Sequence, residues 1–368
     1  MTSAHRSPTA QPVLRDHPRA AQWEAALAAQ PEAEREAARF LVSNMPDSDF
    51  AALDPSAVLA DVHLAFEARA SAPWGGDLPQ DIFFNYVLPY ASLTEPREPW
   101  RREFMEKFQP LVRDCRTPGE AAMQLNANIS KILGVRYTPE PRRPDQGPQE
   151  SIRSGQASCT GLSILLVNAC RAVAVPARVA GIPRWPHKLG NHTWVEIWSE
   201  GRWRVVGAFE PSPLDEVWFT ADAALADPAQ PMHAIWATSW APTGERYIAG
   251  YRRFPRALPG VHAVNVTARY LRPSAEPALP RIYLILLDEQ GRRMARKVTV
   301  RRPDGGVIRQ GTTRGEQNDL NDYFWFELPD GDRAEIEIAR DSEPPFRQTI
   351  TGGSDPHQFV VRTIQGSP

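Results

Sequence analysis

The sequence contains very little cysteine. Three cysteines occur among 368 residues, at positions 115, 159 and 170, and no two of them have the C-x-x-C spacing. This composition argues against a disulfide framework and against a cysteine-rich structural zinc site. Cys159 and Cys170 would lie about 16 Å apart along one helix, beyond the reach of a disulfide. The sequence therefore predicts at least one free thiol.

Neither sign of charge dominates, and long apolar runs are missing. The 42 Lys and Arg residues nearly balance the 44 Asp and Glu residues, so the basic surface that binds nucleic acid is not expected. No run of about 18 apolar residues occurs, so no membrane span is predicted. Residues 1–20 also lack the apolar segment of a signal peptide. We expect a cytoplasmic protein if Met1 is the native start, and an exported one if a signal sequence has been removed.

Proline, in contrast, is abundant, with 36 residues in the chain, and it fixes many loops and element boundaries. The length predicts two or three domains. We predict an α+β fold with a polar tail over residues 1–18, a helical N-terminal region over 19–115, a core over 116–255 and an Ig-like β-sandwich over 262–368. The sandwich prediction rests on short alternating strands separated by turns from residue 262 onward.

Two helix starts in the predicted core have clear sequence markers. "TPGE" at residues 117–120 combines a capping box with proline at the first helical position, which predicts a helix start there. A second helix should begin at Cys159, because "CTGLSILLVNACRAVA" is apolar nearly all round. Such a pattern is typical of a helix buried inside a domain.

The position of Cys159 at a helix start favours reactivity. The unpaired N–H groups and the positive end of a helix dipole stabilise a thiolate. The small neighbouring residues would let a substrate backbone approach, and the Cys159 N–H could bind a developing oxyanion. The alternative is that Cys159 is simply a small buried hydrophobic residue.

A nucleophilic thiol needs a base within hydrogen-bond reach, and His192 is the best candidate. His192 opens the alternating strand "HTWVEIW", which "SEG" joins to "RWRVVGAF" as a hairpin. If this strand packs on the helix that begins at Cys159, the two residues lie at adjoining ends. The alternative is a structural histidine on a strand.

The hairpin also limits which acid can orient His192. Glu196 shares a face with His192 but stands about 13 Å further along the strand, so we exclude it. A three-residue turn at 199–201 would pair Trp198 with Arg202 and place residues 207–210 beside His192.

Glu210 is the only carboxylate in that segment, so we predict it as the acid, with Asp215 as a second candidate. A side chain in this role fixes the imidazole tautomer and stabilises its charged form. The alternative for Glu210 is an exposed acid at the end of a strand.

These segments together resemble a known family. "SGQASCTGLSILLVNACRAVAVPARVAGIPRWP" and "NHTWVEIWSEGRWRVVGAFEP" are similar to the core of the transglutaminase-like superfamily, whose fold is related to papain. The upstream "FNYVLPYASLTEPREPWRREF" is similar to bacterial members, so the resemblance covers roughly residues 80–220. It implies a papain-like fold and cysteine chemistry on amide bonds.

The resemblance carries over to two positions directly. Cys159 matches the nucleophile of the family and His192 matches its general base. The third position departs from the pattern, because the usual Asp of the family falls on Gly207. Either Glu210 supplies the carboxylate from slightly further along the chain, or the Cys–His pair acts alone.

Further side chains are candidates for substrate contacts. Gln156 could offer its amide to an oxyanion, and Trp185 and Trp194 could wall the cleft. The alternatives are a loop glutamine without a role and aromatic residues of an ordinary core. His187 and His192 form an H-x4-H pair without a Cys or acid at ligand spacing, so we predict neither a metal nor a cofactor.

The function predicted from the sequence is cysteine-dependent acyl transfer on amide bonds through a thioester. Water as the acceptor would make the protein a peptidase or amidase, and a lysine amine would make it a protein-glutamine transglutaminase. A non-catalytic binding protein that uses the same cleft is a further alternative. The expected partner is a protein or peptide substrate.

Overall fold

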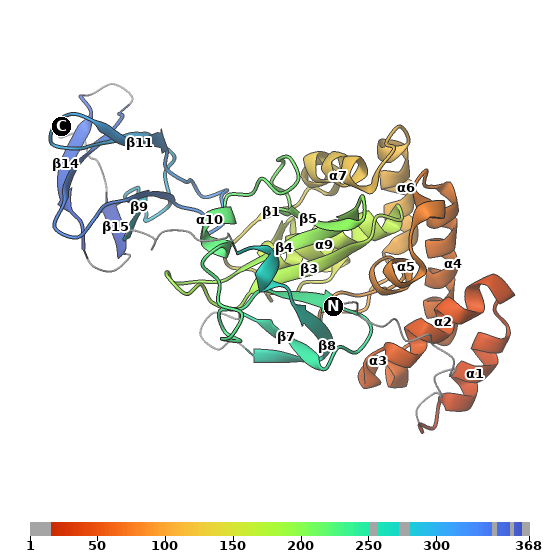
Figure 1. Ribbon diagram of the computed structural model, residues 1–368. Coiled ribbons are helices and arrows are strands. Elements are labelled where there is room, and N and C mark those ends of the chain that lie inside the picture. The colour runs from red at the N-terminus through yellow and green to blue at the C-terminus, as the bar shows by residue number, and fades with distance from the viewer. Residues whose placement is uncertain (1–15, 251–255, 272–279, 341–343, 354–356, 363–368) are drawn as a thin grey trace.

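The computed structural model describes residues 16–250, 256–271, 280–340, 344–353 and 357–362, so most of the predicted tail lies outside the described residues. Figure 1 shows N-terminal helices at one end of the molecule, a sheet with covering helices in the middle, and a β domain at the other end. The architecture is α+β, as predicted from the sequence.

The N-terminal helices pack directly on the central part of the molecule. Trp23 of the first helix belongs to the same hydrophobic cluster as Leu165 and Val195 of the central layers. The Trp74 Nε1–H donates a hydrogen bond of 2.9 Å to the Ala174 carbonyl. The helices are α1 (Ala20–Ala28), α2 (Glu32–Asn44), α3 (Asp47–Ala52), α4 (Pro55–Ser71), α5 (Gln80–Tyr86) and α6 (Arg101–Val112), with a 3₁₀ turn at Gly75–Asp77.

The central part combines a six-stranded antiparallel sheet with helices on one face (Figure 1). The sheet order is β5-β4-β3-β6-β8-β7, and β1 and β2 form a separate parallel pair. The elements are α7 (Pro118–Leu133), β1 (Arg136–Tyr137), α8 (Pro148–Ser154), β2 (Gln156–Ala157), α9 (Cys159–Ala172), β3 (Ala177–Ile182), β4 (His192–Ser199), β5 (Arg202–Val206), α10 (Thr220–Ala223), β6 (Trp236–Ser239), β7 (Glu245–Ala249) and β8 (Arg256–Asn265).

Both predicted helix starts are confirmed. Thr117 caps α7, with its side chain accepting from the Glu120 N–H. Helix α9 begins at Cys159 and is capped by Ser158, whose Oγ accepts from the Gly161 N–H. From Thr160 to Ala172 every residue of α9 is buried, so the apolar sequence fits a helix enclosed by the core.

The β4–β5 hairpin forms as predicted, but its register differs by one residue. Trp198 pairs with Trp203 rather than with Arg202. The turn has two residues, Glu200 and Gly201, with φ angles of 52° and 76°. Two consecutive left-handed residues match the tight hairpin turn that suits the twist of the strands, so the predicted three-residue turn is wrong.

The C-terminal strands form two stacked sheets around their own hydrophobic core. One sheet has the order β11-β10-β13-β14 and the other β12-β9-β15. The first predicted sandwich segment does not belong there, because residues 262–265 lie in β8 and pair with β6 of the central sheet. The strands are β9 (Arg281–Leu287), β10 (Lys297–Arg301), β11 (Val307–Thr312), β12 (Phe324–Glu327), β13 (Arg333–Ile338), β14 (Phe346–Thr351) and β15 (His357–Arg362), after a 3₁₀ turn at Thr267–Arg269.

Candidate active site

The packing of α9 on β4 brings Cys159 and His192 together. Cys159 is the first residue of α9 and His192 the first residue of β4. The next residue of each element makes a direct link, in which the Thr160 hydroxyl donates to the Thr193 hydroxyl over 3.1 Å. The two side chains therefore meet where the helix and the strand begin, as the sequence predicts.

Aromatic rings fix the orientation of the His192 imidazole. Trp194 stacks on it with ring centroids 5.8 Å apart, and Trp218 and Phe219 each lie 4.8 Å away. His192 is only 3% exposed. A ring packed in this way keeps one rotamer, so its nitrogens point in fixed directions.

A carboxylate from the C-terminal domain faces His192. Asp319 Oδ2 lies 3.4 Å from His192 Nδ1, and both side chains are almost fully buried. The other oxygen, Oδ1, accepts hydrogen bonds from the backbone and side-chain N–H groups of Asn321, at 2.8 and 3.0 Å. Within the described residues neither Oδ2 nor Nδ1 makes a hydrogen bond, so the ion pair is the polar contact that they share.

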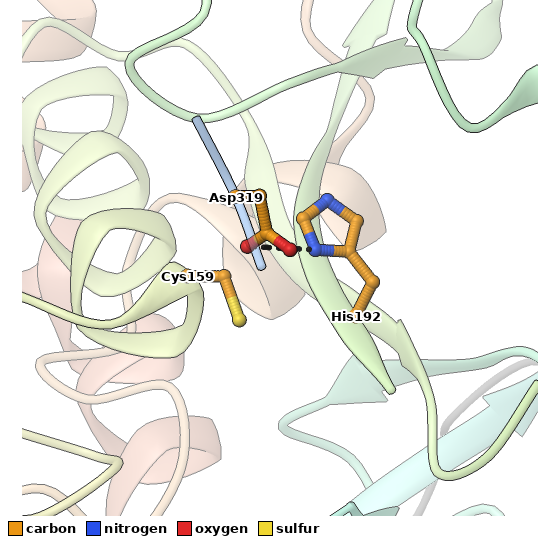
Figure 2. A group of neighbouring side chains, drawn as sticks. All are labelled: Cys159, His192 and Asp319. Atoms are coloured by element: carbon orange, nitrogen blue, oxygen red, sulfur yellow. Dashed lines mark ion pairs between the residues drawn. The ribbon is translucent and has the colours of Figure 1, made fainter. Parts of the chain in front are cut away.

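Cys159, His192 and Asp319 form one compact group. The thiol sulfur, a ring nitrogen and a carboxylate oxygen all lie within 4.8 Å of one another. Figure 2 shows the thiol and the carboxylate on the side of the ring that carries Nδ1, with Nε2 turned away. Nδ1 is therefore the nitrogen placed to exchange a proton with the thiol.

A cleft of about 280 Å³ opens over this group. Its wall combines the thiol, the imidazole and two carboxyl groups with residues of α7, β1 and the segment after β5. The lining residues are Ser130, Arg136, Tyr137, Cys159, Leu162, His192, Thr193, Ala208, Phe209, Glu210, Gln317 and Asp319. The partly exposed thiol is thus reachable from solvent through this cleft.

Glu210 lines the cleft but, within the part of the chain that the structure describes, makes no hydrogen bond or ion pair with His192. Its Oε1 accepts instead from the Trp218 Nε1–H at 3.1 Å. Its Oε2 lies 2.5 Å from the place where a Cβ on Gly207 would stand. The glycine at the usual Asp position of the family therefore leaves the space that the Glu210 carboxyl group occupies.

The remaining carboxylates of the hairpin have structural contacts. Asp215 accepts from the Arg204 Nε–H at 2.5 Å and from the Val205 N–H at 2.8 Å, which ties it to β5. Glu196 is buried and pairs with Arg178 at 2.8 Å, in agreement with its exclusion as the acid.

The predicted substrate contacts lie away from the cleft wall. Gln156 is exposed on β2, and its carbonyl accepts from the side chain of Gln146 at 3.2 Å. Trp194 is fully buried and supports His192. Trp185 is also buried, in the same hydrophobic cluster as Trp194. None of these three side chains lines the cleft, and their predicted roles in substrate binding stay predictions.

Charges in this group favour a protonated imidazole. Burial alone would lower the pKa of His192, but the Asp319 carboxylate and Cys159 outweigh it and raise the pKa to about 10. Burial likewise acts to raise the pKa of Asp319, whereas His192 and the Asn321 hydrogen bonds hold it below its usual value. Burial raises the pKa of Glu210 to about 7. At neutral pH the Asp319 carboxyl group is thus ionised, whereas Glu210 is close to the midpoint of its titration.

The same three residues form the one group of His, Cys and acidic side chains with metal-ligand spacing in the described part of the chain. His187, considered with His192 in the sequence, pairs with Asp222 at 2.8 Å and is not part of it. We assign the group to acid–base chemistry, since Nδ1 and Oδ2 face each other directly and the thiol occupies the helix start.

Sequence reasoning missed Asp319 entirely. It lies more than 120 positions after His192, in the connection between β11 and β12. "NDLND" reads locally as a polar turn, and no local pattern shows that this turn reaches another domain.

A thiol, an imidazole and a carboxylate within 4.8 Å of one another are the groups that a cysteine-dependent enzyme uses. The family comparison agrees: residues 107–208 match the model of the transglutaminase-like superfamily. The chain therefore contains a transglutaminase-like core, which confirms the resemblance found in the sequence.

Three solved structures show more distant similarity. A candidate cysteine protease from Cytophaga hutchinsonii is 19% identical, with a TM-score of 0.29, over 41% of this chain and 51% of its own. A candidate protease from Parabacteroides distasonis is 11% identical, with a TM-score of 0.27, over 54% of this chain and 32% of its own. Red sea bream transglutaminase is 10% identical, with a TM-score of 0.31, over 76% of this chain and 65% of its own. The chain thus spans about half the length of the first of these proteins.

No curated protein matches the chain in sequence. Among the described residues, no helix combines the length and the apolar character needed to cross a membrane.

Proposed function

We propose that the protein is a cysteine-dependent amide hydrolase, a peptidase or amidase, with Cys159 as nucleophile and His192 as general base and acid. The observation that carries the proposal is the grouping of the Cys159 thiol with His192 Nδ1 and Asp319 at the floor of an open cleft. Thiol catalysis requires an activated thiol, a base that takes its proton and a group that orients the base. The helix start, the buried imidazole and the carboxylate supply these three requirements.

The reaction follows from these positions. The thiol proton passes to His192 Nδ1 before the substrate reacts, which gives the protonated imidazole that its surroundings favour. The sulfur then attacks the amide carbonyl carbon. The Cys159 N–H lies in the first turn of α9 without an acceptor inside the helix, so it is available to the oxyanion. The C–N bond breaks as His192 protonates the leaving amine, which leaves a thioester on Cys159. Water then adds with His192 as base, releases the carboxylic acid and restores the thiol.

The test uses Cys159→Ala and His192→Ala on a mixture of protein and peptide amides. Both variants should lose at least about a thousandfold in turnover, as expected when a nucleophile or its base is removed. Cys115→Ala is the matched control and should keep full activity, because Cys115 is buried away from the cleft. Activity that survives in Cys159→Ala contradicts the proposal.

The acceptor is decided in the same assay with a fluorescent primary amine. Release of free acid supports hydrolysis, whereas incorporation of the amine into a glutamine-containing protein would show a transglutaminase instead. A parent protein whose Cys159 neither turns over any amide nor reacts with an electrophile would be a binding protein that uses the same cleft.

A further inference from the structure

The segment that carries Asp319 leaves the C-terminal domain and rests on the core. The Leu320 N–H donates to the Tyr137 hydroxyl at 2.9 Å. The Lys188 ammonium donates to the Asn321 carbonyl at 3.0 Å, and the Asn321 side chain donates to the Asn191 carbonyl at 2.6 Å. Three consecutive residues, 319–321, thus each contact the core, and Asn191 directly precedes His192.

Residues of the C-terminal domain also hold this segment through hydrogen bonds. Arg293 donates to the Asp319 carbonyl at 2.9 Å and also to the Asp322 carbonyl. The Asp322 carboxylate accepts from Arg314 at 2.7 Å. Because both sides hold the backbone around Asp319, its carboxylate has little freedom to leave His192.

Lys188 is the centre of the contact between the two domains. Its ammonium is buried and lies 2.6 Å from Asp222 of α10, and Arg281 of β9 reaches the same carboxylate at 3.1 Å. Four aromatic rings surround the ammonium at 5.1 to 5.5 Å, two from the core and two from the C-terminal domain: Trp185, Trp218, Tyr283 and Tyr323. Burial of the Lys188 ammonium is favourable only while the core supplies Asp222 and two of the rings and the C-terminal domain supplies the other two rings.

We propose that the C-terminal domain completes the active site: Asp319 is a positioning residue that stabilises the charged form of His192, and Lys188 and Asn321 hold it there. This inference rests on the proposed function, because it assigns a role at the same site. It gives the β-sandwich a part in catalysis, which its own sequence did not indicate.

The charged groups around His192 come from several elements. Cys159 comes from α9, Glu210 from the segment after β5, and Asp319 from the C-terminal domain, while Tyr137 of β1 lies near both Cys159 and Asp319. Burial and aromatic packing disfavour a cation at this place. Asp319 forms the ion pair with the ring, so it contributes most of the stabilisation that offsets the cost of burying a charged imidazole.

The chemical role is electrostatic. When the thiol proton moves to Nδ1, a positive charge forms 3.4 Å from the Asp319 carboxylate. The carboxylate stabilises that charge until the proton passes to the leaving amine. Displacement of Asp319 would leave a buried imidazole that binds the proton weakly. The core is therefore fully active only when the C-terminal domain is docked on it.

The direct test is an NMR titration of the His192 ring nitrogens in the full chain, with His192→Ala to assign the signals. In the parent protein His192 should stay protonated beyond pH 8. In Asp319→Asn its midpoint should fall by more than one pH unit, and turnover should fall about tenfold or more with KM little changed. The control is Asp304→Asn, an exposed acid in a turn of the same domain, which should change neither.

Two results overturn the inference. One is a parent His192 that titrates at or below about 6.5, the ordinary value of a histidine; this measurement needs no variant, so a poorly folded Asp319→Asn does not prevent the test. The other is an Asp319→Asn protein with higher turnover, which would show that the segment obstructs the cleft. The titration of His192 does not depend on the substrate, so its failure is distinct from failure of the proposed function.

Discussion

At the scale of single residues, the main departure from the family pattern is that Gly207 stands at the usual Asp position and a carboxyl group, Glu210, follows three residues later. A side chain at position 207 would collide with the Glu210 carboxyl group. The carboxyl group therefore reaches the region of the usual Asp from a position three residues later. Whether it also acts in turnover is a separate question, which its pKa makes testable.

Glu210→Gln should reduce turnover and change its pH dependence. Burial raises the pKa of Glu210 to about 7, so the group is neutral below that pH and ionised above it. If the ionised form supports His192, activity falls as the pH drops through about 7, and the glutamine variant lacks this step. We expect a loss of about tenfold at pH 8, measured as a pH–rate profile.

Asp215→Asn is the matched control for Glu210→Gln, because the bonds of the Asp215 side chain within the described residues go to β5 of the hairpin. Its profile should equal that of the parent. A Glu210→Gln profile that also equals the parent removes Glu210 from the mechanism. Partial recovery in the double variant Gly207→Asp with Glu210→Ala, in which the end of the side chain at position 210 is removed, would confirm that the two positions share one role.

Chelation tests the assignment of Cys159, His192 and Asp319 to acid–base chemistry. Dialysis against a strong chelator should leave turnover and Cys159 alkylation unchanged, because the reaction proposed needs no ion. Loss of activity that returns with added Zn²⁺ would contradict the assignment. The comparison requires only the parent protein.

At the scale of elements, the loop between β3 and β4 is as important as the strands. Gly190 has a φ of +99°, and a Cβ there would lie 1.8 Å from the Asn321 side chain. Gly190→Ala should therefore displace Asn321 and, with it, Asp319. We expect turnover to fall by about tenfold or more through the loss of His192 stabilisation.

Gly201→Ala is the control for Gly190→Ala. Gly201 also has a left-handed φ, of +76°, but no atom lies within 4 Å of a Cβ there. Both variants should lose about 1 kcal/mol of stability from backbone strain, measured by chemical denaturation, and Gly190→Ala should lose more because of its collision with Asn321. Equal turnover in the two variants would contradict a role for the contact with Asn321.

Local patterns predicted the elements better than their pairing. The Thr117 capping box and the apolar run after Cys159 gave the starts of α7 and α9, because caps and burial leave marks within a few residues. The predicted β4–β5 register was wrong by one residue, because Glu200 and Gly201 both adopt a left-handed φ and make the turn one residue shorter. Residues 262–265 were assigned to the wrong sheet, because alternation identifies a strand but not its partner.

At the scale of the whole molecule, the contact between the domains depends on ionised Asp222. Burial acts to raise the pKa of Asp222, but the hydrogen bond from His187 and the charge of Lys188 hold it below the usual value. A depressed carboxyl pKa adds stability at neutral pH, and this contribution is lost as the pH falls through the folded value.

The melting temperature should therefore fall as the pH drops below about 4. Asp222→Asn should melt at a lower temperature than the parent at pH 7 and show a flatter fall in acid, as measured by calorimetry. The comparison variant is Asp304→Asn, an exposed acid in a turn of the C-terminal domain. An acid dependence of Asp222→Asn as steep as that of the parent would contradict the account.

The site was predictable only where one domain supplies it. Cys159 and His192 followed from residue type and element order within the core. Asp319 did not, because its place depends on how two domains dock, and docking rests on scattered groups such as Lys188 and Asn321. Glu210 lines the cleft, whereas the ion pair of His192 is formed with Asp319.

The central claim is that Cys159 and His192 form a reactive pair. The most direct test is iodoacetamide alkylation of each cysteine across pH, read by peptide mass spectrometry in the parent and in His192→Ala. Cys115 and Cys170 are internal controls, since burial raises the pKa of both thiols. Cys159 should react at neutral pH, far faster than the other two cysteines, and its alkylation should slow when His192 is removed. Alkylation of Cys159 at the rate of the buried cysteines, or unaffected by His192→Ala, would contradict the central claim.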